Sequence, residues 1–301
     1  MRNNEIKGII FMLAASLIWS FSTVMIKTAV DDLGPWTFTA IRCLLGGLSM
    51  IPLVIIFDLK GSVKNVDLSS LLPKSALRDC LLLGGVVAAY MMLIQVGIAF
   101  TTIGKCGFIT ALYIIIVPIM GIFLKKMPSL RIWLCVIIAV IGFYLMCMSE
   151  GFSAINKGDV LIFIGAFFCA MQIYFIDSLS KRISPMLLTC LQFLFAGIIC
   201  MVGAFVVEHP TVTEILTAIV PLLYTGVVSC GIGYMLQAYS QKYVEPMKAS
   251  LLFSSETIFT MIFGLIIFQE IMSFREYVGC GLIFFAIVYS IIEPKKKGNE
   301  N

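Results

Sequence analysis

The chain has 301 residues, of which 60% are hydrophobic and only 13% are charged, and its mean hydropathy is +1.04. Soluble globular domains have about 45–50% apolar and about 25% charged residues. The composition therefore excludes an ordinary soluble domain and predicts an integral membrane protein. The net charge of +4 is a matter of membrane topology and does not indicate a nucleic-acid partner.

The ten cysteines are scattered, and nearly all of them lie inside apolar runs. No two have the spacing of about two to four residues that is typical of a metal or redox site. We therefore expect small packing residues and predict no metal or other cofactor. The single histidine, His209, lies in the polar stretch Val207–Pro210. We expect it to be a solvated loop residue and not a ligand or proton relay.

Ten apolar segments follow one another with short connections. Each has about the 17–25 residues that a helix needs to cross a hydrocarbon layer of about 30 Å. We predict transmembrane helices at approximately 8–28, 36–57, 80–100, 107–124, 131–149, 159–177, 186–207, 215–239, 249–268 and 276–292. Arg2 and Lys7 precede the first segment as in a signal peptide, but its apolar character continues past Trp19. We therefore expect this segment to remain as a span.

The basic residues are distributed unequally between the two sides of these spans. With a cytoplasmic N-terminus, sixteen lysines and arginines fall in inside segments, four fall in outside segments, and Arg42 lies within a span. Cytoplasmic connections are normally the ones rich in lysine and arginine, so we predict both termini in the cytoplasm. Lys295–Lys297 is an inner-surface basic cluster and not a KDEL-type signal, so we expect a plasma membrane.

The layout of the fourth and fifth spans returns near the end of the chain. Two apolar runs joined by the basic turn Lys125–Arg131 are matched by a second pair whose charged turn ends in Ser273–Arg275. Five spans lie in each half, so we predict two repeats, 1–149 and 150–301, within one membrane domain. Because five is odd, equivalent helices face opposite ways, which makes the repeat inverted.

Short matches align the two halves. Phe38–Arg42 aligns with Leu188–Gln192 at an offset of 150 residues, and Gln95 aligns with Gln237 at an offset of 142. Insertions in loops change the offset, and identities are few, so the layout supports the repeat more than residue matches do. The predicted fold is an all-α integral membrane protein of ten transmembrane helices, arranged as two inverted five-helix repeats.

Arg42 is a charged residue inside a predicted span. It lies seven residues beyond Pro35, which places it roughly 10 Å inside the outer boundary at about 1.5 Å per residue. A charge at such depth costs at least about 2.5–3.5 kcal/mol, so its side chain should face the helix bundle. Arg42 is a candidate ligand for a substrate carboxylate or phosphate. The alternative is a structural role, in which it bridges helices through carbonyls or an acidic partner.

Glu256 is the second charge at depth, eight residues beyond Lys248 in a stretch that is rich in serine and threonine. A carboxylate in a medium of low dielectric constant is disfavoured in its charged form and is a candidate proton carrier during a transport cycle. The alternative is a permanently protonated glutamic acid that makes a packing hydrogen bond between helices.

Further polar or amphipathic side chains lie inside the predicted spans. Aromatic and amide groups suit a pocket that stacks on a small organic solute and forms hydrogen bonds with it. For any single residue, packing between helices is the alternative role. The candidates are Trp19, Tyr90, Gln95, Thr110, Tyr113, Gln172, Tyr174, Gln192, Tyr234 and Gln237.

Several short motifs follow one another along almost the whole chain. They are Trp19 with Ser20, PWTFTAIR ending at Arg42, FITALYIIIVP ending at Pro118, SLRIWL from Ser129, GDVLIFIGAFFCAMQ ending at Gln172, Gln192, and SSET around Glu256. In order and spacing these motifs resemble the drug/metabolite transporter superfamily in its EamA-type ten-helix form. Thr257 departs from the family's frequent Glu-Pro, and Lys126-Met127 stands where its first half often has an acidic residue like Glu270. The resemblance implies a polytopic carrier that exports or exchanges small metabolites.

The predicted function is secondary active transport of small organic metabolites such as amino acids, with alternating access around a midplane cavity. The partners are a small-molecule substrate and the lipid bilayer, with proton coupling through Glu256 and the oligomeric state open. The chain has no phosphate-binding loop, no His-Glu-x-x-His and no Gly-x-Ser-x-Gly motif, so we predict that it is neither driven by ATP nor an enzyme. A membrane receptor or scaffold is the alternative.

Overall fold

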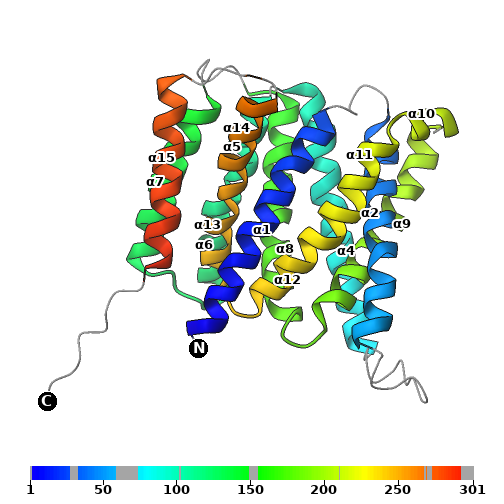
Figure 1. The fold of residues 1–301 in the computed structure, drawn as a ribbon, viewed down its shortest axis with the longest axis horizontal. Helices are drawn as coiled ribbons and strands as arrows, with labels where there is room; N and C mark the ends of the chain where they lie inside the picture. Colours follow the sequence, from blue (N-terminus) through cyan, green and yellow to red (C-terminus); the bar gives the residue numbers. More distant parts are fainter. Residues whose placement is uncertain are drawn as a thin grey trace, which may run out of the picture.

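A computed structural model describes residues 2–27, 33–58, 74–101, 103–148, 155–209, 211–267, 269 and 273–292. Within these ranges every regular element is helical, and ten helical stretches are long and apolar enough to cross a membrane. The all-α membrane fold predicted from the sequence is confirmed. The first turn of α1 and the last turn of α15 lie at the same face of the bundle, as ten crossings require (Figure 1).

The fourth of the first five spans is an interrupted helix. The five spans consist of α1 (Arg2–Lys27), α2 (Pro35–Leu53) continued by the π-helical η1 (Val54–Asp58), α4 (Lys74–Gly97) continued by the 3₁₀ turn η2 (Ile98–Phe100), α5 (Ile103–Ala111) with α6 (Tyr113–Phe123), and α7 (Leu130–Cys147). The fourth span is interrupted at Leu112, whose N–H bonds to the carbonyl of Ile109 in a tighter 3₁₀ pattern. Pro118 lies further along the same span, inside α6.

The second five spans repeat this plan. They consist of α8 (Lys157–Leu179), α9 (Pro185–Val207), α11 (Ile219–Leu223) with the π-helical η3 (Tyr224–Gly233) and α12 (Tyr234–Gln241), α13 (Pro246–Phe253) with α14 (Ser255–Ile267), and α15 (Phe274–Ile291), while the short α10 (Val212–Thr217) precedes α11. The ninth span is interrupted at Ser254, whose N–H bonds to the carbonyl of Leu251. The fourth and ninth spans are therefore both discontinuous at nearly equivalent positions.

Helices α2 and α9 pack closely, and their contacts are reciprocal. A Cβ atom at Gly47 would lie 2.7 Å from Cγ of Leu194, and one at Gly197 would lie 2.7 Å from Cγ of Leu44. Both glycines and both leucines are separated by 150 residues, the offset that aligns the second and seventh spans. Reciprocal contacts of this kind are what a two-fold pseudo-axis between the two helices produces.

The third and eighth spans show the same correspondence. A Cβ atom at Gly84 would lie 3.1 Å from the carbonyl oxygen of Gln192, and one at Gly226 would lie 3.0 Å from that of Arg42. The glycines are 142 residues apart and their partners 150 apart. The predicted inverted repeat is therefore consistent with the packing as well as with the layout.

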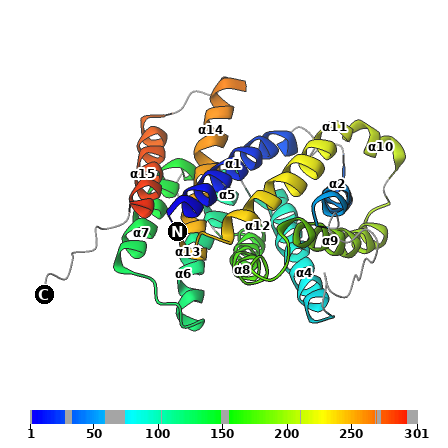
Figure 2. The same cartoon turned by 60° about the horizontal axis from the view of Figure 1, so that its bottom comes forward.

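The hairpin that first indicated the repeat begins in the same way in both halves. Ser129 caps α7 by accepting a hydrogen bond from the N–H of Ile132, and Ser273 caps α15 by accepting one from Glu276. Helices α7 and α15 lie side by side at one end of the bundle, and α2 and α9 lie at the other end (Figures 1 and 2).

Glu208 ties the beginning of α2 to the end of α9. Its carboxylate accepts hydrogen bonds from the N–H groups of Trp36 and Thr37, at 2.9 and 2.8 Å, and from the Thr37 hydroxyl. These donors are among the N–H groups that a helix start leaves unpaired, and a negative charge there also suits the helix dipole. The neighbouring His209 is exposed, as predicted.

Several residues used in the sequence-based predictions lie outside the described residues. These are Lys60, Lys64, Glu270, Lys295, Lys296 and Lys297. All ten cysteines are free, and none is exposed.

Candidate functional site

Aromatic residues from several spans meet in the interior of the bundle. The ring of Trp19 on α1 lies 4.8 Å from that of Tyr234 on α12 and 5.3 Å from that of Phe253 on α13. The hydroxyl of Tyr234 is hydrogen-bonded to the hydroxyl of Tyr90 on α4. Trp19 Nε1 is buried and has no hydrogen-bond partner among the described residues. These rings therefore form an amphipathic surface with an unused donor.

Arg42 lies beside this aromatic group. Arg42 is 8% exposed, and its guanidinium carbon lies 5.5 Å from the centre of the Phe38 ring. Tyr90 and Tyr234 are near enough to interact electrostatically with its charge. In the described part of the chain no carboxylate forms an ion pair with Arg42, and its Nε has no hydrogen-bond partner. A cation inside a membrane span without a compensating anion is a feature of ligand sites.

Glu256 lies in the first turn of α14, directly after the interruption at Ser254. Tyr113 and Cys169 lie within electrostatic range of its carboxylate. The side chain is partly exposed although it lies inside a span, and it forms no ion pair with any described residue. The site thus contains one cation and one anion that are not paired with each other.

Cys169 on α8 lies near both the tyrosines beside Arg42 and the carboxylate of Glu256. It lies within electrostatic range of Tyr90, Tyr113 and Tyr234 as well as Glu256. Cys169 is not among the site residues expected from the sequence, in which a cysteine inside an apolar run indicates only packing. We define the central cluster as Trp19, Arg42, Tyr90, Tyr113, Cys169, Tyr234 and Glu256.

Members of the central cluster occupy equivalent positions in the two halves. Trp19 and Cys169 are separated by 150 residues, the offset of the second and seventh spans. Tyr113 and Glu256 are 143 apart, and each follows the interruption of its span. Interrupted spans at a repeat interface are a recurring way of building transporter binding sites near the membrane midplane. The arrangement is symmetric, but the two charges have no charged counterparts.

Two of the predicted amides bond to each other and not to the central cluster. Gln172 and Gln237 are buried and exchange hydrogen bonds of 3.4 Å, and Gln237 also donates to Gln241 at 3.1 Å. Gln241 in turn donates to the carbonyl of Ile173. This chain of amides joins α8 to α12, which is the kind of contact that the alternative packing role of Gln172 and Gln237 predicts.

The other predicted residues form no bond to either charge among the described contacts. Tyr174 donates to the carbonyl of Val117 at 2.8 Å, which ties α8 to α6. Gln192, the counterpart of Arg42, is fully buried, and neither atom of its amide has a partner in the described ranges. Gln95 and Thr110 are half-buried. For these two side chains the described contacts include no bond to the central cluster.

One ion pair lies near each of the two faces of the bundle at which the spans begin and end. Lys105 Nζ lies 2.6 Å from a carboxylate oxygen of Asp159, and Lys248 Nζ lies 2.8 Å from one of Glu5. The first pair is almost fully buried and also includes the Thr101 hydroxyl, whereas the second is about a quarter exposed. The two lysines are 143 residues apart, like Tyr113 and Glu256. Each pair joins the start of a discontinuous span to the start of α8 or α1.

Comparison with known proteins places the chain among transporters. The sequence pattern of the EamA-like transporter family matches it twice, at residues 6–148 and 156–292. An uncharacterized transporter of Archaeoglobus fulgidus is 28% identical over 275 residues, which cover 91% of this chain and 82% of that protein. The uncharacterized transporter YcxC of Bacillus subtilis is 23% identical, over 94% of this chain and 93% of its own length.

A likeness in sequence and shape extends over almost the whole molecule. The uncharacterized transporter YoaV of Bacillus subtilis is 19% identical and covers 95% of this chain and 98% of its own length. A crystal structure of a protein superimposes with a TM-score of 0.74 at 14% identity, covering 94% of this chain and 97% of that one. At this identity the match shows a shared fold, and it agrees with the resemblance that the motifs indicated.

Proposed function

Because the chain belongs to the EamA-like transporter family, we propose that it is a secondary active transporter that exports or exchanges small zwitterionic metabolites such as amino acids. The observation that carries this proposal is the pair of unpartnered opposite charges, Arg42 and Glu256, beside one group of aromatic rings inside the membrane. A receptor or scaffold has no need to maintain two uncompensated charges at this depth, where each is costly.

In this proposal Arg42 binds the substrate carboxylate. The guanidinium has a planar set of donors that matches two carboxylate oxygens, and its contacts in the structure leave these donors available. Trp19 and Tyr234 supply a stacking surface for the organic part of the substrate. A single cation beside aromatic faces favours one small anionic group, which agrees with a carboxylate.

Glu256 couples transport to protons in the same proposal. A carboxylate in a medium of low dielectric constant is stabilised either by binding a proton or by binding a cationic group. A substrate ammonium group and a proton then compete for Glu256. Because only one of them can be bound at a time, the substrate crosses the membrane in one direction and the proton in the other. The position of Glu256 after a helix interruption supports this role, since the carboxylate is partly exposed and not packed against a partner.

Alternating access in this proposal uses the two halves as the moving parts. The ion pairs Lys105–Asp159 and Lys248–Glu5 connect discontinuous spans to α8 and α1 at opposite ends. Both are formed in the structure, so each opening towards one side requires the release of one pair. Residues 1–149 and 150–301 are the two repeats, and both termini face the cytoplasm of a cell whose plasma membrane holds the protein.

The test is counterflow of radiolabelled amino acids in proteoliposomes that contain the wild-type protein or Arg42→Gln. This change places at position 42 the same side chain as that of its counterpart, Gln192. Loss of a charged hydrogen-bonding group is worth about 1.5–3 kcal/mol, so we expect uptake to fall about 10- to 150-fold. Arg182→Gln, which removes an exposed arginine, is the control. Normal counterflow by Arg42→Gln would overturn the role of Arg42, and no counterflow by the wild type would overturn the substrate class.

A further inference from the structure

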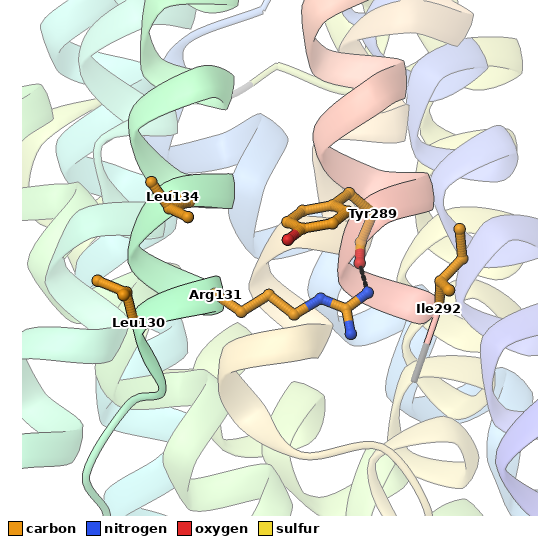
Figure 3. A pocket seen from close by; sticks show the side chains of 5 residues that line it. All are labelled: Leu130, Arg131, Leu134, Tyr289 and Ile292. Carbon is orange, nitrogen blue, oxygen red and sulfur yellow. Dashed lines mark hydrogen bonds between the residues drawn. The ribbon is translucent and has the colours of Figure 1, made fainter. Parts of the chain in front are cut away.

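A groove lies between α7 and α15, far from the central cluster. It has a volume of about 430 Å³ and is lined by Leu130, Arg131, Leu134, Tyr289 and Ile292 (Figure 3). The two helices form one end of the bundle in both overall views (Figures 1 and 2). The groove is therefore at the lateral surface, which faces lipid, and not on a route across the membrane.

Arg131 provides the polar part of this groove. Its guanidinium donates a hydrogen bond to the backbone carbonyl of Tyr289 and lies 4.5 Å from the centre of the Tyr289 ring. Its Nε is buried without a hydrogen-bond partner, and none of the carboxylates in the described ranges forms an ion pair with it. Arg131 follows the cap residue Ser129 by two positions, so this cation, which pairs with no carboxylate in the described part of the chain, lies at the boundary of a span.

The remaining lining residues form an apolar wall beside the cation. Leu130 is 76% exposed, Leu134 is 44% exposed and Ile292 is 57% exposed. Leu130 and Leu134 are four residues apart and therefore lie on the same face of α7, one turn apart along the helix axis. An occupant that fits this groove has an anionic group for Arg131 and an apolar part that extends from it along α7.

We propose that the groove binds the phosphate of an anionic glycerophospholipid through Arg131, with an acyl chain along Leu130 and Leu134. A basic pocket between helices at the membrane surface has the charge that such a headgroup requires. Arg131 on α7 is already bonded to the carbonyl of Tyr289 on α15. A lipid bound to Arg131 therefore lies at the contact between these two helices.

The pseudo-symmetric counterpart of Arg131 offers a matched control. Arg275 on α15 lies 144 residues after Arg131 and makes the same two contacts with Tyr144 on α7, a hydrogen bond of 3.4 Å to the carbonyl and a ring contact of 5.1 Å. Its Nε is likewise buried without a hydrogen-bond partner in the described ranges, but its neighbour is Glu276, whose carboxylate caps α15, whereas Arg131 is followed by Ile132. Because the negative charge of Glu276 weakens the attraction of an anion to Arg275, Arg275→Gln tests mainly the loss of the helix contact.

The experiment compares thermal stability of the delipidated protein in detergent after addition of phosphatidylglycerol or phosphatidylcholine with identical acyl chains. A ligand that binds only the folded state raises the melting temperature. We expect phosphatidylglycerol to raise the melting temperature of the wild type more than phosphatidylcholine does. Arg131→Gln should reduce this difference by at least half, and Arg275→Gln should retain it. An undiminished difference in Arg131→Gln, or an equal loss in Arg275→Gln, would overturn the proposal.

Two further arms separate a bound lipid from a bound free phosphate. Glycerol 3-phosphate, which has the phosphate but no acyl chain, should produce no comparable shift, and an equal shift would show that the apolar wall plays no part. Leu134→Ser changes an exposed residue that does not belong to the core, so this variant is expected to fold. It should weaken the preference for phosphatidylglycerol even where Arg131→Gln does not yield stable protein, and an unchanged preference would contradict the proposed position of the acyl chain.

Discussion

The packing between the two halves and the chemistry at their centre follow different rules. At the α2–α9 contact, Gly47 meets Leu194 and Gly197 meets Leu44. The two glycines are pseudo-symmetric counterparts of each other, and so are the two leucines. In the central cluster, Arg42 is the counterpart of an amide, Gln192, and Glu256 is the counterpart of a phenol, Tyr113. The scaffold is thus repeated, whereas each charge occurs only once. Repetition permits two related conformations, and the single charges give the proposed substrate one orientation in both.

The largest expected effect concerns Glu256, whose counterpart Tyr113 carries no charge, and Glu256→Gln removes this anion. If Glu256 is the coupling group, accumulation by the wild type responds to a pH gradient with about a tenfold change per pH unit, because one unit corresponds to about 1.36 kcal/mol. Glu256→Gln should make accumulation independent of the gradient. It should weaken but not abolish exchange of substrate for substrate, because the proposed ammonium group loses its anionic partner while Arg42 still binds the carboxylate. The measurement is uptake in proteoliposomes with imposed pH differences. A gradient dependence that survives the change would make Glu256 a packing residue.

The two ion pairs are expected to differ in strength although their lysines are equivalent. Lys105→Ala breaks a nearly buried pair and should cost about 3–5 kcal/mol, because Asp159 keeps its charge without its partner. Lys248→Ala breaks a pair that is about a quarter exposed and should cost about 1 kcal/mol or less. The free energy of unfolding in mixed micelles measures both. Equal losses of unfolding free energy in Lys105→Ala and Lys248→Ala would show that burial does not determine the strength of the two ion pairs.

The glycines at the α2–α9 contact should respond equally in both halves. Gly47→Ala and Gly197→Ala each place a Cβ atom less than 3 Å from a leucine backbone nitrogen, which cannot move easily. We expect each to cost about 1–3 kcal/mol of unfolding free energy through overpacking. Gly85→Ala is the matched control, since a Cβ atom there has no neighbour within 4 Å. It should be neutral or stabilising, because alanine favours the helix. A neutral Gly47→Ala would mean that the contact is looser than the geometry indicates.

Hydropathy and charge were sufficient to predict the spans and the two unusual charges, whereas the family was indicated by the order and spacing of short motifs. Arg42 and Glu256 stood out because a charge inside an apolar run is rare, and that signal needs no knowledge of neighbours. The inverted repeat followed from an odd number of spans in each half. These features are local or additive along the chain, so the sequence alone contains them.

Other features of the site depend on which helices meet, and sequence reasoning missed them. Cys169 is one of many cysteines in apolar runs, and only its offset of 150 residues from Trp19 distinguishes it. The interruptions at Leu112 and Ser254 have neither proline nor glycine to mark them. Glu208 lies in a polar connection, where a capping carboxylate resembles a solvated one until its partner helix is known.

The bonds of Glu208 have a mechanical consequence. They fasten the ends of α2 and α9 to each other, and the close glycine contacts prevent the two helices from sliding along their length. In the proposed alternating-access cycle we therefore expect the pair to move as one rigid unit that includes a helix from each repeat, so that the halves move relative to each other mainly by rotation about it. Arg42 belongs to this rigid unit and Glu256 does not, so we expect the distance between the two charges to change during the cycle.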